Sequence, residues 1–268
     1  MKKPKNHFLS LIIPVYKQER TIVKNIIVVK KVLDSIRYHY EIIAVIDGII
    51  DSSREKILEA KIPKVSVLHY QYNQGKSYAI RFGMHEAKGD YVMFLDAGNE
   101  IDPNGISMLL EHMQWYDADI IVGSKRHLAS YVRYSFLRKI LSTGYYWFVR
   151  IFFGIKVRDT QAGIKVFKKQ VLEAILPRLL EKKFAGDLEM LVVADTLGFS
   201  RIFEAPIKLD YSLGEVTSAA TLRSIWGIVI DTLAIFYRKN ILHYYDKVHE
   251  KREGSWAPFT KLYRTQRI

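Results

Sequence analysis

The stretch Tyr91-Val92-Met93-Phe94-Leu95-Asp96-Ala97-Gly98-Asn99-Glu100 joins an apolar run to a loop that carries two carboxylates. An uninterrupted apolar run indicates a strand buried on both faces, as in a parallel sheet. Ligands of such sheets bind at the carboxyl ends of the strands, where Asp96 stands. Because Mg²⁺ and Mn²⁺ prefer oxygen ligands, Asp96 and Glu100 are candidate metal ligands. The alternative is a capped turn before Pro103.

Strand and helix patterns alternate on both sides of this stretch. The expected strands are 9–16, 41–47, 65–69, 91–95, 119–123, 164–167 and 199–207. The expected helices are 19–38, 52–60, 74–87, 106–115, 169–175, a helix from 186, and 222–237. This order predicts an α/β fold with a Rossmann-like, mostly parallel sheet flanked by helices. We expect one domain over 1–215, followed over 216–268 by an amphipathic helix and a basic tail.

Composition narrows the function classes. The 268 residues include no cysteine, which excludes disulfides and thiolate chemistry and suits a reducing cytoplasm. The formal net charge of +13 favours a polyanionic partner, such as a phosphorylated substrate, an anionic membrane surface or nucleic acid. The sequence shows neither a signal peptide nor an apolar run long enough to span a membrane.

Two segments carry polar groups suited to a nucleotide. Asp47 ends a predicted strand, where a carboxylate accepts hydrogen bonds from a base or a ribose, although Asp-Gly also favours an ordinary turn. Asn73-Gln74-Gly75-Lys76 precedes a predicted helix, whose N-terminus favours an anion. The residues alone leave the nucleotide and turn interpretations open for both segments.

Basic and aromatic residues alternate between positions 126 and 158. Arginine among aromatic rings is typical of nucleic-acid grooves and of membrane interfaces, and a core helix with solvated charges is the simpler alternative. The density of rings favours the membrane interpretation. We expect no nucleic-acid partner, because phosphate and membrane ligands already account for the charge. Asp187 opens another helix, either as a catalytic or acceptor-orienting group or as an N-cap.

Taken together, these motifs resemble the inverting family-two glycosyltransferases of GT-A fold, and among them the polyprenyl-phosphate (dolichyl-phosphate) mannosyl- and glucosyltransferases. The matching positions follow the family order over about residues 8–215: 12–16, Glu19, Asp47-Gly48, Asp51, 73–76, Ala79, Arg81, Gly83-Met84, 89–91, Asp96-Ala97, Gly123-Ser124, Arg126, 158–163 and 187–189.

The resemblance implies transfer of a hexose from a UDP- or GDP-sugar to a polyprenyl phosphate, with inversion and with Mg²⁺ or Mn²⁺. It also implies a site for each group. The nucleotide-sugar residues would be Pro14, Tyr16, Glu19, Asp47, Lys76, Asp96 and Gln161; the metal ligands Asp96 and Glu100; the catalytic residues Asp96, Asp187 and Arg126; and the acceptor-phosphate residues Arg126, Arg133 and Arg138. Asp159 would help to shape the sugar and acceptor site. The enzyme would sit peripherally on the cytoplasmic face of an anionic membrane.

Four departures from the family pattern keep alternatives open. Ile46 stands where an aspartate usually precedes Asp47, and Gly98 replaces the middle acid of the metal motif. Basic acceptor-binding residues are not evident over 210–215, and the usual C-terminal spanning helices are absent. The alternatives are a family-two transferase with a soluble glycan acceptor and a non-catalytic nucleotide-sugar or membrane-binding protein with a degenerate metal site.

Overall fold

The structure is a computed structural model that describes residues 7–98, 100–130, 136–209, 222–247 and 266–267. Within these residues one sheet has the strand order β7-β5-β6-β4-β1-β2-β3-β8. The strands are β1 Phe8–Val15, β2 His39–Asp47, β3 Val65–Tyr70, β4 Tyr91–Leu95, β5 Ile120–Ser124, β6 Ile164–Lys168, β7 Ile202–Pro206 and β8 Gln266–Arg267. The α-helices are α1 Ile22–Ser35, α2 Ser53–Glu59, α3 Lys76–Glu86, α4 Ile106–Trp115, α5 Phe136–Phe153, α6 Lys169–Ile175, α7 Gly186–Thr196 and α8 Leu222–Asn240.

The prediction of a mostly parallel sheet is confirmed. β1 pairs in parallel with β2 and β4, β2 with β3, and β5 with β7. β6 runs antiparallel to its neighbours β4 and β5, which the residue pattern did not reveal. This reversal brings the segment that precedes β6, residues 158–163, to the edge where β4 and β5 end. One antiparallel strand therefore delivers a loop to the ligand-binding edge of the sheet.

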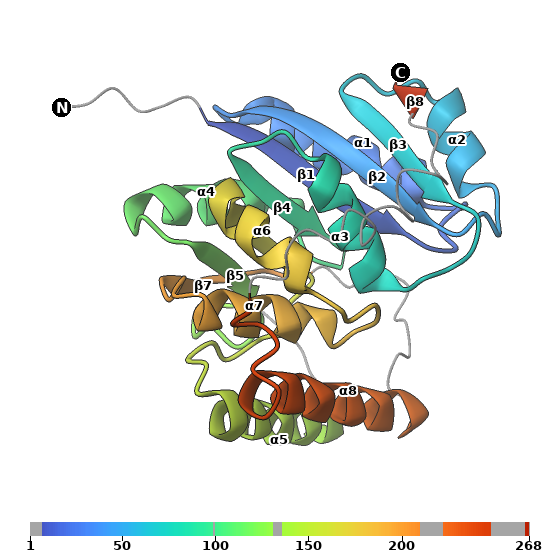
Figure 1. The fold of residues 1–268 in the computed structure, drawn as a ribbon. Helices are drawn as coiled ribbons and strands as arrows, with labels where there is room; N and C mark the ends of the chain where they lie inside the picture. Colours follow the sequence, from blue (N-terminus) through green and yellow to red (C-terminus); the bar gives the residue numbers. More distant parts are fainter. Residues whose placement is uncertain (1–6, 99, 131–135, 210–221, 248–265, 268) are drawn as a thin grey trace.

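Helices cover both faces of the sheet (Figure 1), and the alternation of side chains along each strand fills two cores. In β1, Leu11 and Ile13 pack with α1, α2 and α4, whereas Ile12 packs on the opposite face with α3, α6 and α7. The apolar runs are thus long because the central strands are buried on both sides.

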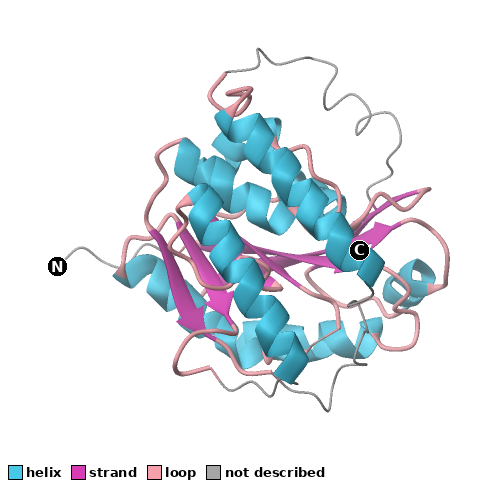
Figure 2. Ribbon diagram, turned by 90° about the horizontal axis from the view of Figure 1, so that it is seen from below, coloured by secondary structure: helices cyan, strands magenta, loops and turns pink. Residues whose placement is uncertain are grey.

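Helices α5 and α8 lie together at one end of the molecule (Figures 1 and 2). The ring of Phe236 on α8 packs edge-on against Phe152 and Phe153 of α5, with centroid distances of 5.1 and 6.1 Å. The hydroxyls of Tyr145 and Thr232 also join the two helices at 3.2 Å. No helix in the described part of the chain combines the length and hydrophobicity needed to cross a membrane.

The segment after α8 is anchored in the main core by a buried carboxylate. Glu189 on α7 is fully buried and accepts hydrogen bonds from the backbone N–H groups of Leu180 and Glu181 and from the Tyr245 hydroxyl at 2.8 Å. Burial raises the pKa of both Glu189 and Tyr245. The described residues that follow α8 in the sequence therefore share the core of the domain. The domain border at residue 215 stays a prediction.

Replacing Tyr245 by Phe should remove one donor from the buried Glu189 carboxylate. We expect the free energy of unfolding in urea to fall by about 1–3 kcal/mol, the usual cost of an unsatisfied buried polar group. Tyr237→Phe is the matched control, because Tyr237 is 52% exposed on α8. Its effect should stay within about 0.5 kcal/mol. Equal losses in the two variants would contradict this anchoring role.

Candidate active site

Two adjoining cavities open at the carboxyl ends of β1, β2 and β4. One of about 590 Å³ is lined by Lys17, Gln18, Glu19, Arg20, Thr21, Ile50, Asp51, Asp96, Gly98, Glu100, Ile101 and Lys125. The other, of about 520 Å³, is lined by Pro14, Val15, Tyr16, Gln18, Asp47, Asn73, Gln74, Gly75, Lys76, Asp96, Ala97, Gly98, Lys183 and Phe184. Because both share Gln18, Asp96 and Gly98, they form one cleft with Asp96 at its middle.

The Asp47 carboxylate organises the loop that leads into α3. It is 3% exposed and accepts hydrogen bonds from the Tyr70 hydroxyl, the Asn73 amide and the backbone N–H groups of Gln74 and Gly75, at 2.7 to 3.2 Å. The turn interpretation of Asp47 thus has direct structural support. A role in binding the nucleoside stays a proposal.

Two glycines allow this loop to lie close to its neighbours. Gly48 has φ +86°, and a Cβ there would come within 2.6 Å of the backbone nitrogen of Asn73. Gly75 has φ +103°, and a Cβ there would come within 2.5 Å of the carbonyl oxygen of Lys182. Both the left-handed conformation and the close approach therefore require glycine at these two positions.

Lys76 begins α3 and reaches the strand tip of β4. Its Nζ lies 2.9 Å from Oδ1 of Asp96 and donates a hydrogen bond to Oδ2 at 3.1 Å. The same Nζ lies 3.4 Å from Oδ2 of Asp187. The other oxygen of Asp187 accepts a 2.7 Å bond from Nζ of Lys165, which also donates to the carbonyl of Ala162 at 2.8 Å. Two lysines and two aspartates thus form one alternating chain of charge.

Burial and charge act against each other in this chain. Burial favours the neutral form of Asp187, but the adjacent ammonium groups of Lys165 and Lys76 lower its pKa below the ordinary value. Burial lowers the pKa of Lys76 less than Asp187 and Asp96 raise it, so its pKa is above the ordinary value. Burial lowers the pKa of Lys165, and the charge of Asp187 restores part of that loss. Asp187 and Lys76 are therefore charged at neutral pH.

The loop before β6 packs directly against Asp96. The backbone N–H of Asp96 donates to the carbonyl of Gly163 at 3.0 Å. A Cβ on Gly163 would lie 2.3 Å from Oδ2 of Asp96, so any larger residue would displace this carboxylate. Gln161 in the same loop donates to the Tyr145 hydroxyl of α5 at 3.2 Å. The loop thus links the strand tip to helix α5.

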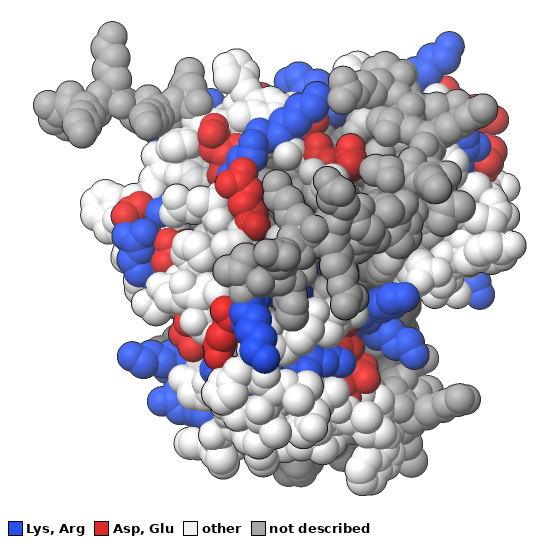
Figure 3. Space-filling view, viewed as in Figure 1, with Lys and Arg blue, Asp and Glu red and all other residues white. Residues whose placement is uncertain are grey.

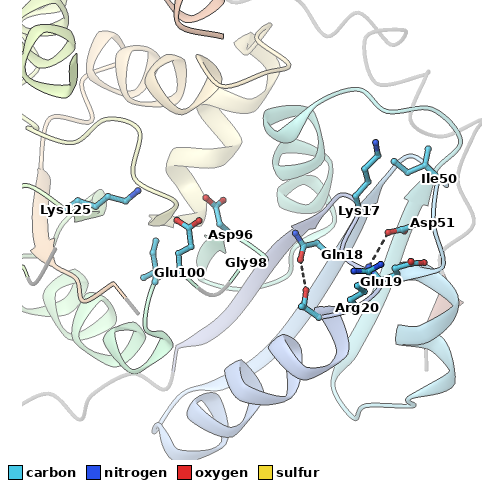
Figure 4. A pocket seen from close by; sticks show the side chains of 12 residues that line it. Lys17, Gln18, Glu19, Arg20, Ile50, Asp51, Asp96, Gly98, Glu100 and Lys125 are labelled. Atoms are coloured by element: carbon cyan, nitrogen blue, oxygen red, sulfur yellow. Dashed lines mark hydrogen bonds between the residues drawn. The ribbon is translucent and has the colours of Figure 1, made fainter. Parts of the chain in front are cut away.

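Glu100 and Lys125 lie on the other side of Asp96. Figure 4 shows the Asp96 and Glu100 carboxylates pointing into the same part of the cavity, with the Lys125 ammonium extending toward them. Oδ1 of Asp96 is buried without an acceptable hydrogen bond. Among the described residues, no three acidic or histidine side chains converge as a metal-binding group. Asp96 and Glu100 thus remain a two-carboxylate candidate for a cation.

The arginines named from the sequence have different positions. The Arg126 guanidinium donates to the Ser142 carbonyl at 2.7 Å and the Thr143 hydroxyl at 2.8 Å, and it lies over the Tyr146 ring. It therefore ties the segment after β5 to α5. Arg133 and the side chain of Arg138 lie outside the described part of the structure, so their acceptor roles stay predictions.

The cleft brings together most of the residues named from the sequence. Pro14, Tyr16, Glu19, Asp47, Lys76, Asp96 and Glu100 line it. Asp187 lies behind Lys76 at 1% exposure, and Asp159 accepts a hydrogen bond from the backbone N–H of Lys125 at 2.9 Å.

Sequence reasoning missed Lys125 and Lys165. Lys125 follows a predicted strand directly, which was a usable positional signal. Lys165 interrupts the apolar strand 164–167, and a charged residue within a central strand signals a buried partner.

Asp47→Asn should disorganise the loop before Lys76, because an amide replaces one of the two acceptor oxygens with a donor. We expect the free energy of unfolding in urea to fall by about 1–3 kcal/mol, since buried backbone N–H groups lose their acceptor. Asp246→Asn, in an exposed position after α8, is the control and should change little. If both variants unfold at the same urea concentration as the parent, Asp47 does not hold this loop.

The chain is similar in sequence to two dolichyl-phosphate beta-glucosyltransferases. The dolichyl-phosphate beta-glucosyltransferase of Drosophila melanogaster is 30% identical over 205 residues, covering 70% of this chain and 63% of that protein. The Dictyostelium discoideum protein of the same name is 29% identical over 208 residues, covering 72% and 63%. The chain thus spans 63% of the length of these relatives.

A crystal structure of glucosyl-3-phosphoglycerate synthase from Mycobacterium tuberculosis, in complex with Mg²⁺ and uridine-diphosphate, superimposes with a TM-score of 0.64 at 14% identity. The match covers 85% of this chain and 79% of that one, which establishes the GT-A fold. The model of glycosyl transferase family 2 matches residues 10–176. The chain therefore belongs to glycosyl transferase family 2.

Proposed function

We propose that this protein transfers a hexose from a UDP- or GDP-sugar to a polyprenyl phosphate, with inversion at the anomeric carbon. The single observation that carries the proposal is the cleft with Asp96 at its middle, flanked by the cations Lys76 and Lys125. Such a cleft suits a nucleoside diphosphate, because it sits at the carboxyl ends of parallel strands. The acceptor class is supported by the names of the dolichyl-phosphate relatives.

The chemistry of this transfer needs little from a general base. An oxygen of the acceptor phosphate, already anionic at neutral pH, forms the new bond to the anomeric carbon. The bond from that carbon to the donor diphosphate breaks, and the leaving nucleoside diphosphate takes the electron pair. The main requirement is stabilisation of negative charge on the leaving group. Lys76 is placed to supply it, and Asp187 holds Lys76 from behind as a positioning residue.

A divalent cation fits the acidic part of the cleft. Oδ1 of Asp96 has the Lys76 ammonium at 2.9 Å as an ion-pair partner but makes no hydrogen bond, and the Glu100 carboxylate points into the same part of the cavity (Figure 4). Mg²⁺ commonly uses one or two carboxylates, with water and phosphate oxygens at its other positions. We propose Asp96 and Glu100 as the ligands. When bound, the cation would neutralise charge on the leaving diphosphate.

We also propose an anionic membrane surface as the place of the reaction. Exposed apolar side chains lie on α5, on α8 and on the two residues that follow α8, and we call this set the apolar face. It comprises Trp147, Ile151, Phe152, Trp226, Ile230, Leu233, Tyr237, Ile241 and Leu242, all at least 37% exposed. Figure 3 shows lysine and arginine side chains close to this largely uncharged end. Apolar rings and aliphatic groups next to cations suit an interfacial helix pair on anionic lipid.

Contacts connect the apolar face to the cleft. Tyr145 of α5 bonds both Thr232 of α8 and Gln161, which belongs to the loop that packs against Asp96. An acceptor whose polyprenyl chain stays in the bilayer can thus present its phosphate near the cleft. The lack of cysteine supports the cytoplasmic side as the location.

Binding of a nucleotide sugar without turnover is a second candidate. It is favoured by Gly98 in the metal motif and by the ion pair that Lys76 makes with Asp96. A thermal-shift screen with UDP- and GDP-sugars, with and without Mn²⁺, identifies the donor in either case, because a ligand of the folded state raises the melting temperature. Transfer to a short polyprenyl phosphate then separates the two candidates.

Asp96→Asn should reduce transfer of the sugar to a short polyprenyl phosphate in detergent by about a hundredfold or more, because charge stabilisation at the leaving group is lost. The measurement is radiolabelled lipid product formed per enzyme at saturating donor and Mn²⁺. Asp246→Asn is the control and should retain the parent rate. Unchanged turnover in Asp96→Asn would contradict the assignment of Asp96 as a metal ligand.

The parent protein should float with liposomes that contain an anionic lipid, and more weakly at high salt. Ile151→Glu and Ile230→Glu should each weaken binding by about tenfold or more, because a buried isoleucine contributes about that much. Ile27→Glu is the matched control, since Ile27 is 50% exposed on α1, outside the apolar face. If all three variants float equally, the apolar face does not bind the membrane.

A further inference from the structure

Lys165 is a buried cation that the proposed transfer does not use. Its side chain is fully buried, its Nζ is 2.7 Å from Asp187 Oδ1, and it lies 5.1 Å from the centre of the Phe94 ring. Burying an ammonium group is costly unless a counter-charge is close. The pair of Lys165 and Asp187 therefore has a direct electrostatic effect on the charged groups beside it.

The two carboxylate oxygens of Asp187 face different lysines. Oδ1 faces Lys165 at 2.7 Å, and Oδ2 faces Lys76 at the longer distance of 3.4 Å. Lys76 is closer to Asp96, at 2.9 and 3.1 Å. Because Lys165 already neutralises most of the Asp187 charge, the Lys76 ammonium is drawn toward Asp96. Without Lys165, the full charge of Asp187 would attract Lys76 inward.

Asp96 is also the carboxylate proposed to hold a divalent cation. The side chain of Asp96 is 44% exposed, so a cation can reach it from the cleft. An ammonium group at 2.9 Å occupies the same oxygens and repels a second positive charge. The two cations therefore cannot both be close to Asp96 at full occupancy.

We propose that Lys76 is a tethered cation that competes with the divalent metal for Asp96, and that Lys165, acting through Asp187, is the positioning residue that keeps Lys76 there. The inference rests on the metal site of the proposed function. A displaced Lys76 has a second partner in Asp187 Oδ2 and lies in reach of a donor diphosphate. Metal would thus bind weakly alone and firmly together with the nucleotide sugar.

The test measures Mn²⁺ binding to the full chain without donor, by the electron paramagnetic resonance signal of free Mn²⁺. Lys76→Gln should bind Mn²⁺ about tenfold or more tightly than the parent, since a direct cationic competitor is removed. Lys125→Gln is the matched control. It removes the same charge from the other cavity of the cleft, and among the described residues Lys125 makes no ion pair with Asp96.

The two variants separate direct competition from a general charge effect. At high salt the effect of Lys125→Gln should vanish, because exposed charges are screened, whereas that of Lys76→Gln should persist. Equal affinities for Mn²⁺ in Lys76→Gln and Lys125→Gln at high salt overturn the competition. The melting temperature of each variant checks that it is folded.

The positioning role of Lys165 is tested by a double-mutant cycle. Lys165→Met should tighten Mn²⁺ binding in the parent, where Lys76 then moves toward Asp187, and should add nothing in the Lys76→Gln background. A Lys165→Met effect of equal size in both backgrounds overturns this role. If the single variant does not fold, Lys165→Met with Asp187→Asn removes both buried charges and leaves the local net charge unchanged, so Lys76 should stay beside Asp96. That double variant should bind Mn²⁺ about as tightly as the parent, and a gain in affinity as large as that of Lys76→Gln overturns the positioning role.

The outcome is independent of the transfer assay. If the parent protein transfers sugar but Lys76→Gln leaves the Mn²⁺ affinity unchanged, the competition is overturned. The proposed function is then still supported. The expected Mn²⁺ affinities without transfer from any donor support the competition and count against the transferase.

Discussion

The negative charge of Asp187, buried between Lys165 and Lys76, is the interaction on which the rest of the site depends. An unpaired carboxylate at this depth would cost several kcal/mol. Pairing it requires β6, α7 and α3 to meet at one point, and Lys76 extends the contact to Asp96 at the tip of β4. The arrangement of these four elements and the charge state of the cleft are therefore set together.

A second buried carboxylate positions the same lysine from the other side. Asp47 accepts hydrogen bonds from the loop that precedes Lys76, so it fixes the backbone, whereas Asp187 fixes the ammonium group. Two glycines with left-handed φ angles allow the loop to pack as closely as this requires. The position of Lys76 beside Asp96 is thus specified from both ends of its side chain.

Hydrogen bonds also connect the surroundings of the cleft to the end of the molecule where α5 and α8 lie. Tyr145 contacts α8 and the loop that packs against Asp96, and Arg126 ties the segment after β5 to α5. The helices that expose the apolar face are therefore linked by hydrogen bonds to the loops beside the cleft. Figure 1 shows them beneath the sheet, at the end where Figure 3 shows few charged side chains. A membrane bound there would contact helices that hydrogen-bond to the loops next to the cleft.

The sequence by itself determined the order of most strands and helices, the family, and the position of Asp96 at a strand end, because apolar periodicity and strand-end acids are local signals. It did not predict helix α5 or strand β8. It left Asp47 open between nucleotide binding and a turn, and it gave no sign that β6 is antiparallel. Only the tertiary structure paired Lys165 with Asp187 and placed Lys76 on Asp96. Lys165 and Asp187 are 22 positions apart, Lys76 and Asp96 are 20 apart, and Lys76 and Asp187 are 111 apart. The energies of these pairs therefore depend on distances that no local pattern encodes.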